Sequence, residues 1–288
     1  MNTISANVLV RNEIQHVDSF VHNMLEAGID EVIFLDGGST DGSYERLLYW
    51  KKKYSFIHVL SWEQPQGSSY RKGFNEVARR NLLIDASSMR WCLYIDIDER
   101  IPVSFKEDIL NVINKDKNNF CAIPIYQFWS QNIRVNSSDD KVWYPCLKYR
   151  LFRRKEYIRF KSNDINGLHN YLTYKGKRVI GGFNKSGLIR LLVKGYHYWL
   201  KYMFGVYQET SSSTCIFHFH YFDLASKKEN DLRGKEFGFE IKIVSSVEEG
   251  LQYKLRDSII PCILSSKINS AEEIKQKYIY DFSLHSNS

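Results

Sequence analysis

The sequence predicts an α/β fold built on a mostly parallel sheet with helices on both faces. Two observations support this prediction. Segments of strand and helix character alternate through the first 125 residues, and short turn-forming segments join them. The chain has 288 residues, 43% of them hydrophobic, which is enough to bury a sizeable core. We therefore expect one continuous fold with sub-regions.

The expected elements follow one another along residues 1–125. Short apolar or β-branched runs predict strands at residues 4–10, 31–35, 57–60 and 91–95. Apolar residues at helical spacing predict helices at residues 18–27, 44–50 and 73–86. Gly28 is expected to end the first of these helices. Because the connections are short, the strands should run mostly in parallel.

The pattern changes after Pro124. Aromatic, irregular stretches such as IYQFWSQNI predict a half made of mixed strands and loops over residues 126–225. From about residue 226 the chain is charged and helix-prone, which predicts a C-terminal helical extension over residues 226–288. The chain therefore divides into three expected sub-regions.

The net charge and the cysteine content indicate which classes of partner and which cellular compartment suit this protein. A formal net charge of +7 suits anionic partners such as sugar nucleotides, phospholipid headgroups or nucleic acid, without choosing among them. Five scattered cysteines without a C-x-x-C pair indicate neither a disulfide framework nor a zinc cluster. The sequence shows no signal peptide and no spanning segment of roughly 18 apolar residues. We expect a cytoplasmic protein.

Three acidic residues, Asp96, Asp98 and Glu99, directly follow the expected strand at residues 91–95. The carboxyl ends of strands are where open α/β sheets bind ligands. Carboxylate oxygens favour Mg²⁺ or Mn²⁺, and such a cation typically keeps open positions for substrate phosphates. The alternative is a solvated acidic turn or a helix N-cap.

A second polar segment, DGGSTDGS, closes the expected strand at residues 31–35. Its glycines allow close backbone approach to a ligand, and Asp36 can accept hydrogen bonds from a base or ribose. The alternative is a flexible turn in which Thr40 or Asp41 caps the next helix. The segment is neither a P-loop nor a G-x-G-x-x-G motif.

Taken together, these motifs resemble glycosyltransferase family 2 and its close relatives of the GT-A fold. The order is Asn12-Glu13, then EVIFLDGGSTDGS, then ARRN at residues 78–81, then WCLYIDIDE ending at Glu99. The similarity covers roughly the first 105 residues and continues more loosely to about residue 235. It implies a Rossmann-like GT-A sheet that binds a nucleotide sugar through residues 1–125, with an acceptor-side half over residues 126–225.

The resemblance also implies roles for individual residues. Asp96 would contact ribose or metal-bound water, and Asp98 would bind the metal that bridges the diphosphate. Asp36, Asn12 and Glu13 would line the nucleotide pocket, with Arg80 nearby. Many relatives carry two adjacent acids where this chain has Asp36 followed by Gly37, so the base contacts depart from the family pattern.

The second half contains a basic segment and a departure from the family pattern. KYRLFRR at residues 148–154 resembles a segment that precedes a histidine in bacterial members of the family. Its cations can neutralise diphosphate or an anionic acceptor, or form the solvated face of a strand. Family members often follow with His-Glu, whereas this chain has His169-Asn170. Asn170 cannot act as a base, so Asp164 is the nearest candidate.

Two histidines near the end of this half are candidate metal ligands. HFHY at residues 218–221 resembles a segment of a neighbouring GT-A family in which a late histidine completes the metal site. Alternation in a strand puts His218 and His220 on the same face, and we prefer His220. The alternative is a packed core histidine.

The expected function is metal-dependent transfer of a sugar from a nucleoside diphosphate sugar to a hydroxyl acceptor, with Mn²⁺ or Mg²⁺ as cofactor. We expect a hexosyltransferase of the inverting type in surface glycan or polysaccharide synthesis, with a glycan or lipid-linked acceptor; a nucleic-acid partner is not expected. One alternative is a non-catalytic nucleotide-sugar or glycan-binding protein of the same fold. The other is a nucleotidyltransferase, which would be expected to show an early Gly-rich, Lys/Arg-bearing loop that this chain lacks.

Residues 189–207 combine aromatic and apolar side chains with Arg190, Lys194 and Lys201. The stretch is too charged to span a bilayer but suits its interface, which predicts peripheral contact with the inner face of the membrane. The alternative is a buried acceptor-side helix or strand pair.

Overall fold

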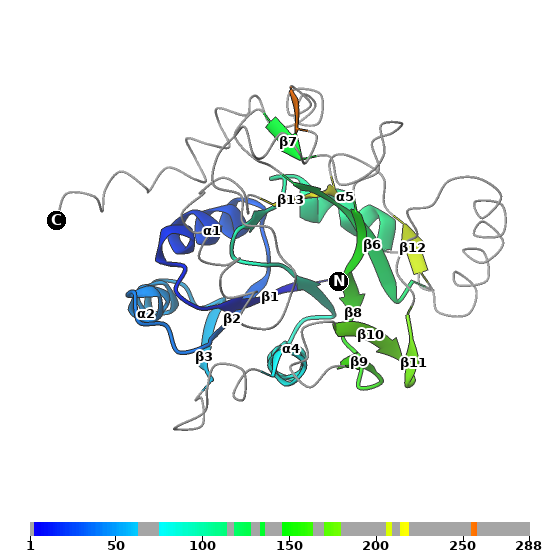
Figure 1. The fold of residues 1–288 in the computed structure, drawn as a ribbon, viewed down its shortest axis with the longest axis horizontal. Helices are drawn as coiled ribbons and strands as arrows, with labels where there is room; N and C mark the ends of the chain where they lie inside the picture. Colours follow the sequence, from blue (N-terminus) through cyan, green and yellow to red (C-terminus); the bar gives the residue numbers. More distant parts are fainter. Residues whose placement is uncertain are drawn as a thin grey trace.

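Nine of the described strands form one central sheet (Figure 1). The computed structural model describes residues 3–62, 75–113, 118–127, 133–135, 146–163, 170–179, 206–208, 214–218 and 255–257. The strands lie in the order β3 (Ile57–Ser61), β2 (Glu31–Asp36), β1 (Ile4–Val10), β4 (Trp91–Tyr94), β8 (Cys146–Arg153), β6 (Phe120–Gln127), β13 (Ile216–His218) and β5 (Glu99–Arg100), with β12 (Val206–Gln208) paired to β6.

The direction of the strands changes across this sheet. β3, β2, β1 and β4 pair in parallel, whereas β8 pairs antiparallel with both β4 and β6. β5 is a two-residue strand that pairs antiparallel with β13. The predicted α/β fold is confirmed, and the strands of the second half are mixed in direction as expected.

The helices in the described part of the chain are α1 (Ile14–Glu26), α2 (Ser43–Lys53), α4 (Glu76–Ala86) and α5 (Phe105–Ile113). The helix expected from residue 18 begins four residues earlier, at Ile14. Its first N–H groups have partners, because Ser43 Oγ accepts from the Glu13 N–H at 2.9 Å and Asp41 Oδ2 accepts from the Ile14 N–H at 3.0 Å. Similarly, Asn75 caps α4 by accepting from the Ala78 N–H at 2.9 Å.

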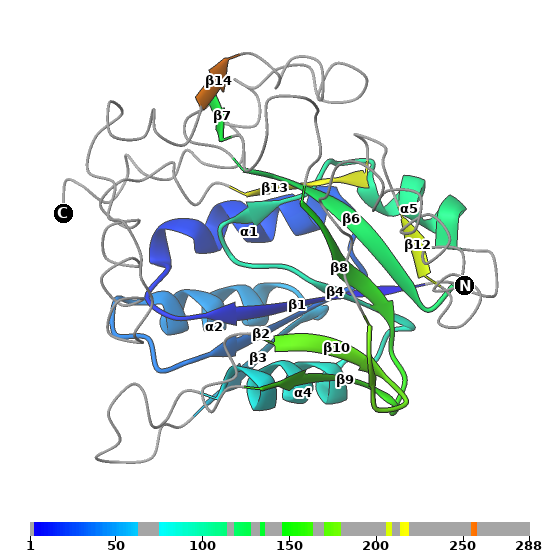
Figure 2. The same ribbon diagram turned by 45° about the vertical axis from the view of Figure 1, so that its right-hand side comes forward.

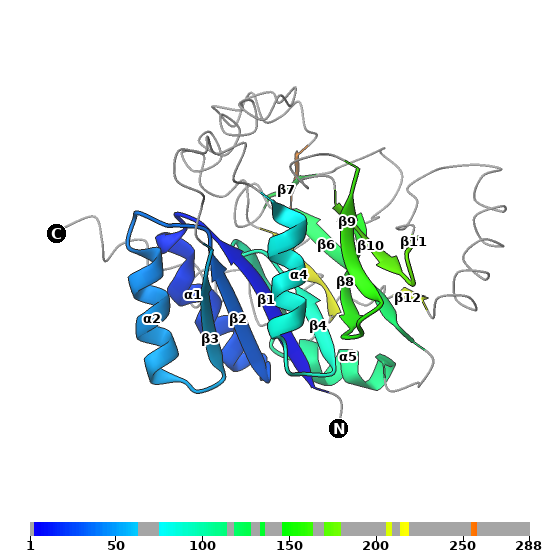
Figure 3. The same cartoon turned by 90° about the horizontal axis from the view of Figure 1, so that it is seen from below.

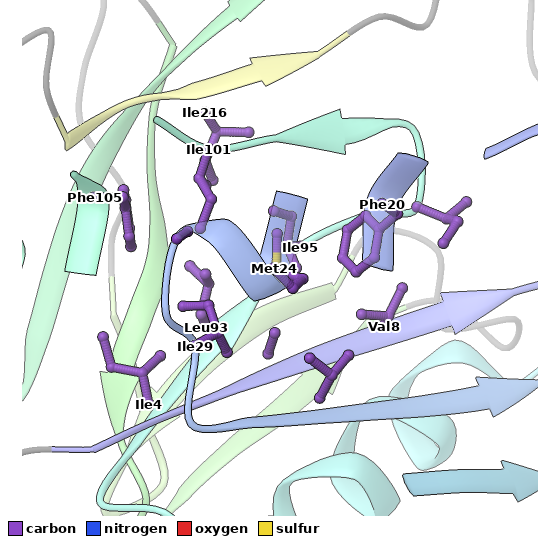
Figure 4. Packing of buried hydrophobic residues seen from close by; sticks show 14 of the residues in the cluster. Ile4, Val8, Phe20, Met24, Ile29, Leu93, Ile95, Ile101, Phe105 and Ile216 are labelled. Carbon is purple, nitrogen blue, oxygen red and sulfur yellow. The ribbon is translucent and has the colours of Figure 1, made fainter. Parts of the chain in front are cut away.

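The sheet is buried on both faces, because alternate residues of each strand enter different cores. In β2, Val32 and Phe34 pack with α1, α2 and α5, whereas Ile33 and Leu35 pack against α4. Figure 3 shows α4 lying along its face of the sheet, in front of β1. Figure 4 shows the larger core, where α1, β1, β4, the segment after β5 and β13 meet in one cluster.

A small second sheet packs beside α4 (Figure 2). It consists of the antiparallel strands β9 (Ile158–Ser162), β10 (Asn170–Tyr174) and β11 (Lys177–Arg178). The Asn81 side chain on α4 donates to the Phe160 carbonyl at 3.0 Å and accepts from the Phe160 N–H at 2.9 Å. α4 and this smaller sheet therefore cover the same face of the central sheet, since residues of both share one cluster with β4, β6 and β8.

The expected C-terminal helical extension differs from the structure where the structure describes it. Within residues 226–288 that part is residues 255–257, and these form β14 (Leu255–Asp257), paired antiparallel with β7 (Ile133–Val135). Their backbone hydrogen bonds go to a neighbouring strand instead of along a helix. The predicted membrane-interface segment lies outside the described residues except at 206–207, which begin β12. Among the described helices, none has the length and apolar character needed to cross a bilayer.

Candidate functional site

A cleft of about 230 Å³ lies at the carboxyl ends of β1, β2 and β4. Its lining residues come from these strand ends, from α4 and from the turn after β4: Leu9, Val10, Arg11, Glu13, Leu35, Glu76, Arg79, Arg80, Asp96, Ile97 and Asp98. Because parallel strands end at one edge of the sheet, residues far apart in the sequence meet here. Of the predicted site residues, Glu13, Arg80, Asp96 and Asp98 line this cleft.

Asp96 lies between two arginines. Arg150 Nη2 donates to Asp96 Oδ2 at 3.2 Å, and Arg80 Nη2 lies 4.0 Å from Asp96 Oδ1. Burial opposes ionisation, but Arg150 and then Arg80 outweigh it and hold the pKa of Asp96 below its usual value. Asp96 is therefore an ionised carboxylate, and its side chain is 35% exposed toward the cleft.

Asp98 meets His218, which comes from the end of the chain's second half. β13 pairs antiparallel with β5, so that His218 lies opposite Glu99. This register brings His218 Nε2 to 3.1 Å from Asp98 Oδ2. Burial lowers the pKa of His218, but the Asp98 carboxylate more than offsets it and the net direction is upward. The structure thus brings together two residues that the sequence separates by 120 positions.

Asp98 and His218 fit two adjacent ligands of one divalent cation. In octahedral coordination with bonds of about 2.1 Å, neighbouring ligand atoms lie about 3 Å apart, close to the 3.1 Å observed. Within the described ranges no group of three or more His, Cys, Asp or Glu side chains is arranged to hold a metal. A site with few protein ligands and remaining positions for phosphates is the usual arrangement for Mg²⁺. His220 and Asp164 lie outside the described residues.

Asn12 and Asp36 hold the DGGSTDGS turn together. Asp36 Oδ2 accepts from the backbone N–H groups of Gly38 and Ser39, at 2.9 and 3.0 Å. Asn12 has a positive φ of 54° and its Oδ1 accepts from the Thr40 N–H at 2.8 Å. Neither residue is among those that line the cleft. The alternative of a turn that caps a helix also applies, because Asp41 Oδ1 accepts from the N–H of the first α2 residue at 2.9 Å.

The side chain of Asn170 forms a hydrogen bond with the carboxylate of Glu76. Its Nδ2 donates to Glu76 Oε1 at 2.8 Å, and Arg80 Nε donates to the same oxygen at 2.6 Å. The Arg80 guanidinium also lies 3.5 Å from the centre of the Tyr94 ring. β10 of the small sheet is thereby joined to the α4 side of the cleft.

Sequence reasoning missed several residues of this site. Arg11, Glu76 and Arg79 line the cleft, although the motifs do not indicate them as site residues. Arg79 stands next to Arg80 in the ARRN segment, so its position offered a signal, whereas nothing in the sequence distinguishes Glu76. Glu99 was noted only as the third acid of its cluster. Burial is the main influence that raises its pKa, to about 7.

A family model and several solved structures match parts of this chain. A family model described as "Glycosyl transferase family 2" matches residues 5–176. The solved structures similar to this chain include TarS 1–349 of S. aureus in complex with UDP, with 17% identity over 44% of this chain and 36% of that chain, TM-score 0.38. No curated protein matches the sequence.

Two further similar structures contain manganese. The mannosyltransferase PcManGT from Pyrobaculum calidifontis, in complex with GDP-Man and Mn²⁺, has 14% identity over 42% of this chain and 34% of its own, TM-score 0.35. GalNAc-T7 with UDP, GalNAc and Mn²⁺ has 16% identity over 44% of this chain and 24% of its own, TM-score 0.38. This chain therefore covers about a third or less of the length of each of these three structures. Since the family model spans more than half of the sequence, the chain belongs to glycosyltransferase family 2, with the α/β fold of the GT-A class.

Proposed function

We propose that this protein is a metal-dependent glycosyltransferase that moves a sugar from a nucleoside diphosphate sugar to a hydroxyl acceptor. The observation that carries the proposal is the contact of His218 with Asp98, which together with Asp96 lines the cleft at the carboxyl ends of the parallel strands. Family membership supports the same reaction class.

Each residue has a distinct part in this proposal. Asp98 and His218 would hold Mn²⁺ or Mg²⁺, which would supply positive charge to stabilise the diphosphate leaving group. Asp96 would contact ribose or metal-bound water, and Arg80 and Glu13, which also line the cleft, would form part of the nucleotide pocket. Asn12 and Asp36 shape the loop that borders this pocket through the hydrogen bonds within the turn.

The acceptor side of the proposal rests on residues outside the described ranges. We propose an inverting hexosyl transfer in surface glycan synthesis, with Asp164 as the base that removes the acceptor proton and His220 as a further metal ligand. Asn170 supports a base elsewhere, since its amide donates to Glu76 and cannot take a proton. A lipid-linked acceptor and peripheral membrane contact through residues 189–207 remain predictions.

The Asp98→Asn variant tests the metal assignment. The substitution keeps the shape of the side chain but removes the charge, so turnover of the donor should fall by about 100-fold or more, because metal charge stabilisation contributes several kcal/mol. The measurement is release of nucleoside diphosphate from a panel of nucleotide sugars with MnCl₂, with and without EDTA.

The matched control is Asp85→Asn on the exposed face of α4. Asp85 is 58% exposed and pairs with Arg159 at 2.7 Å, so this variant should retain wild-type turnover. Full activity of Asp98→Asn in the presence of EDTA would contradict the assignment of Asp98 as a metal ligand. A wild-type protein that binds a nucleotide sugar, yet neither hydrolyses it nor transfers the sugar, would favour the non-catalytic alternative.

A further inference from the structure

Arg150 comes from β8, in the second half of the chain, but its side chain contacts the acidic turn, which we define as Asp96 to Glu99. Its side chain is 6% exposed, and its Nη2 lies 2.7 Å from Glu99 Oε1 and 3.2 Å from Asp96 Oδ2. One guanidinium nitrogen therefore bridges two carboxylates of the same short turn. β8 can deliver it there because it pairs antiparallel with β4, the strand that leads into Asp96.

Glu99 completes a closed set of contacts around Asp96. The Glu99 side chain is fully buried, and its Oε2 accepts from the Asp96 backbone N–H at 2.8 Å. The Asp96 backbone is thus tied to Glu99, Glu99 to Arg150, and Arg150 to the Asp96 carboxylate. A buried ion pair needs such additional hydrogen bonds to offset desolvation, and in return it specifies one geometry.

The Tyr94 ring fixes the guanidinium from another direction. The Arg150 guanidinium carbon lies 4.1 Å from the centre of this ring. Arg150 is not among the described side chains that line the cleft, whereas Asp96 is. Its influence on a bound molecule would therefore pass through Asp96.

We propose that Arg150 is a positioning residue, which with Glu99 holds the Asp96 carboxylate in its binding orientation. Three carboxylates within four residues repel one another, and Arg150 neutralises two of them on the side away from the cleft. Without it, Asp96 turns away from Glu99 and its binding orientation is lost. This inference deepens the proposed function and rests on it for the identity of the ligand.

The test is nucleotide binding to the Arg150→Met variant of the full chain. Methionine keeps much of the apolar volume but removes both contacts. Calorimetry with UDP and with GDP, each with MnCl₂, should show binding weakened by about 10- to 100-fold, as is typical when a partner of a metal-site residue is lost. Arg150→Lys should recover part of the affinity, because an ammonium can reach one carboxylate but lacks the planar fork.

Arg153→Met is the matched control, three residues further along the same strand. Arg153 is also buried and also lies over an aromatic ring, that of Trp91 at 4.9 Å, but it donates to the Asn118 carbonyl instead of the acidic turn. This variant should lose stability while keeping wild-type affinity for the nucleotide. Equal loss of affinity in both variants would reduce Arg150 to a structural role and overturn the proposal.

Crystal structures of Arg150→Met and Arg153→Met separate positioning from direct contact. The Asp96 carboxylate should be displaced in Arg150→Met and unmoved in Arg153→Met. Affinity within about twofold of wild type in Arg150→Met, or weakened binding with Asp96 in place, overturns the proposal. If the wild-type protein binds neither nucleotide and none of the nucleotide sugars in the panel, the proposed function fails, and the position of Asp96 still decides the role of Arg150.

Discussion

Asp36 and Asn12 each satisfy backbone groups of the turn that follows β2. Asp36 Oδ2 accepts two backbone hydrogen bonds within its own turn, and its side chain is buried. Asn12 is likewise tied to Thr40. Short polar side chains next to glycines satisfy local backbone groups as readily as a ligand.

The Asn170→Asp variant tests whether this position needs an amide. The change replaces the donor that faces Glu76 Oε1 at 2.8 Å with a like charge, so the protein should lose about 1–3 kcal/mol of stability. Urea unfolding measures the loss. Glu76→Gln should relieve it in the double variant, because one charge is then gone.

Asn163→Asp is the matched substitution for this experiment. The Asn163 Oδ1 accepts from the Tyr171 hydroxyl at 3.0 Å, and aspartate retains that acceptor. Stability should therefore change little. If Asn163→Asp destabilises the protein as much as Asn170→Asp, the added negative charge is responsible in general. The specific contact of residue 170 with Glu76 would then not explain the loss.

Helices α1 and α4 are each joined to a neighbouring segment by a pair of hydrogen bonds from one asparagine side chain. The Asn23 side chain on α1 donates to the Ile101 carbonyl at 2.8 Å and accepts from the Ile101 N–H at 2.9 Å. Asn81 on α4 makes the same pair of bonds to Phe160 in β9. In each case one amide satisfies both polar groups of a backbone unit.

The two helices should nevertheless differ in their effect on the site. Ile101 follows β5 directly, and β5 begins at Glu99, so α1 supports the acidic turn. Asn23→Ala leaves two buried backbone groups without partners, each costing about 1–3 kcal/mol. We expect lower stability in urea unfolding and also weaker Mn²⁺-dependent nucleotide binding. Asn81→Ala should lose stability alone; the idea fails if the two variants weaken binding equally.

At the scale of the whole molecule, both halves of the chain share one central sheet. Cys92 in β4, Cys121 in β6 and Cys215 directly before β13 are not in disulfide bonds, and all three are fully buried. The main cluster includes residues of β1, β4, β6, β8 and β13. Sub-regions that share a core in this way should unfold together.

Thiol labelling measures this cooperativity. Burial raises the pKa of Cys92 to about 12, so at about pH 8 its thiol stays protonated in the folded protein and ionises far more readily once unfolded. Iodoacetamide should therefore modify Cys92, Cys121 and Cys215 at a common rate set by global unfolding, as followed by mass spectrometry of the peptides. Faster labelling of Cys215 than of Cys92 would show that the second half opens on its own. Labelling of all three in guanidinium chloride is the control.

The parallel half of the sheet and the position of Asp96 to Glu99 at its edge could be predicted from sequence patterns. The four strands expected there match β1, β2, β3 and β4 to within one residue at each end. Their apolar runs are buried on both faces and bounded by turn residues, so local pattern is sufficient to identify them. The same pattern predicts where Asp96 and Asp98 lie, because a strand buried on both faces has to end before charged residues begin.

The residues that complete the site come together through the pairing of strands that are distant in the sequence. His218 reaches Asp98, and Arg150 reaches Asp96 and Glu99, through the pairing of β13 with β5 and of β8 with β4. Glu76 is joined to Asn170 across 94 positions. The register between distant strands depends on how the faces of the sheet pack. Alternation in a strand sequence predicts which face a side chain lies on, but not which residue of the neighbouring strand it pairs with.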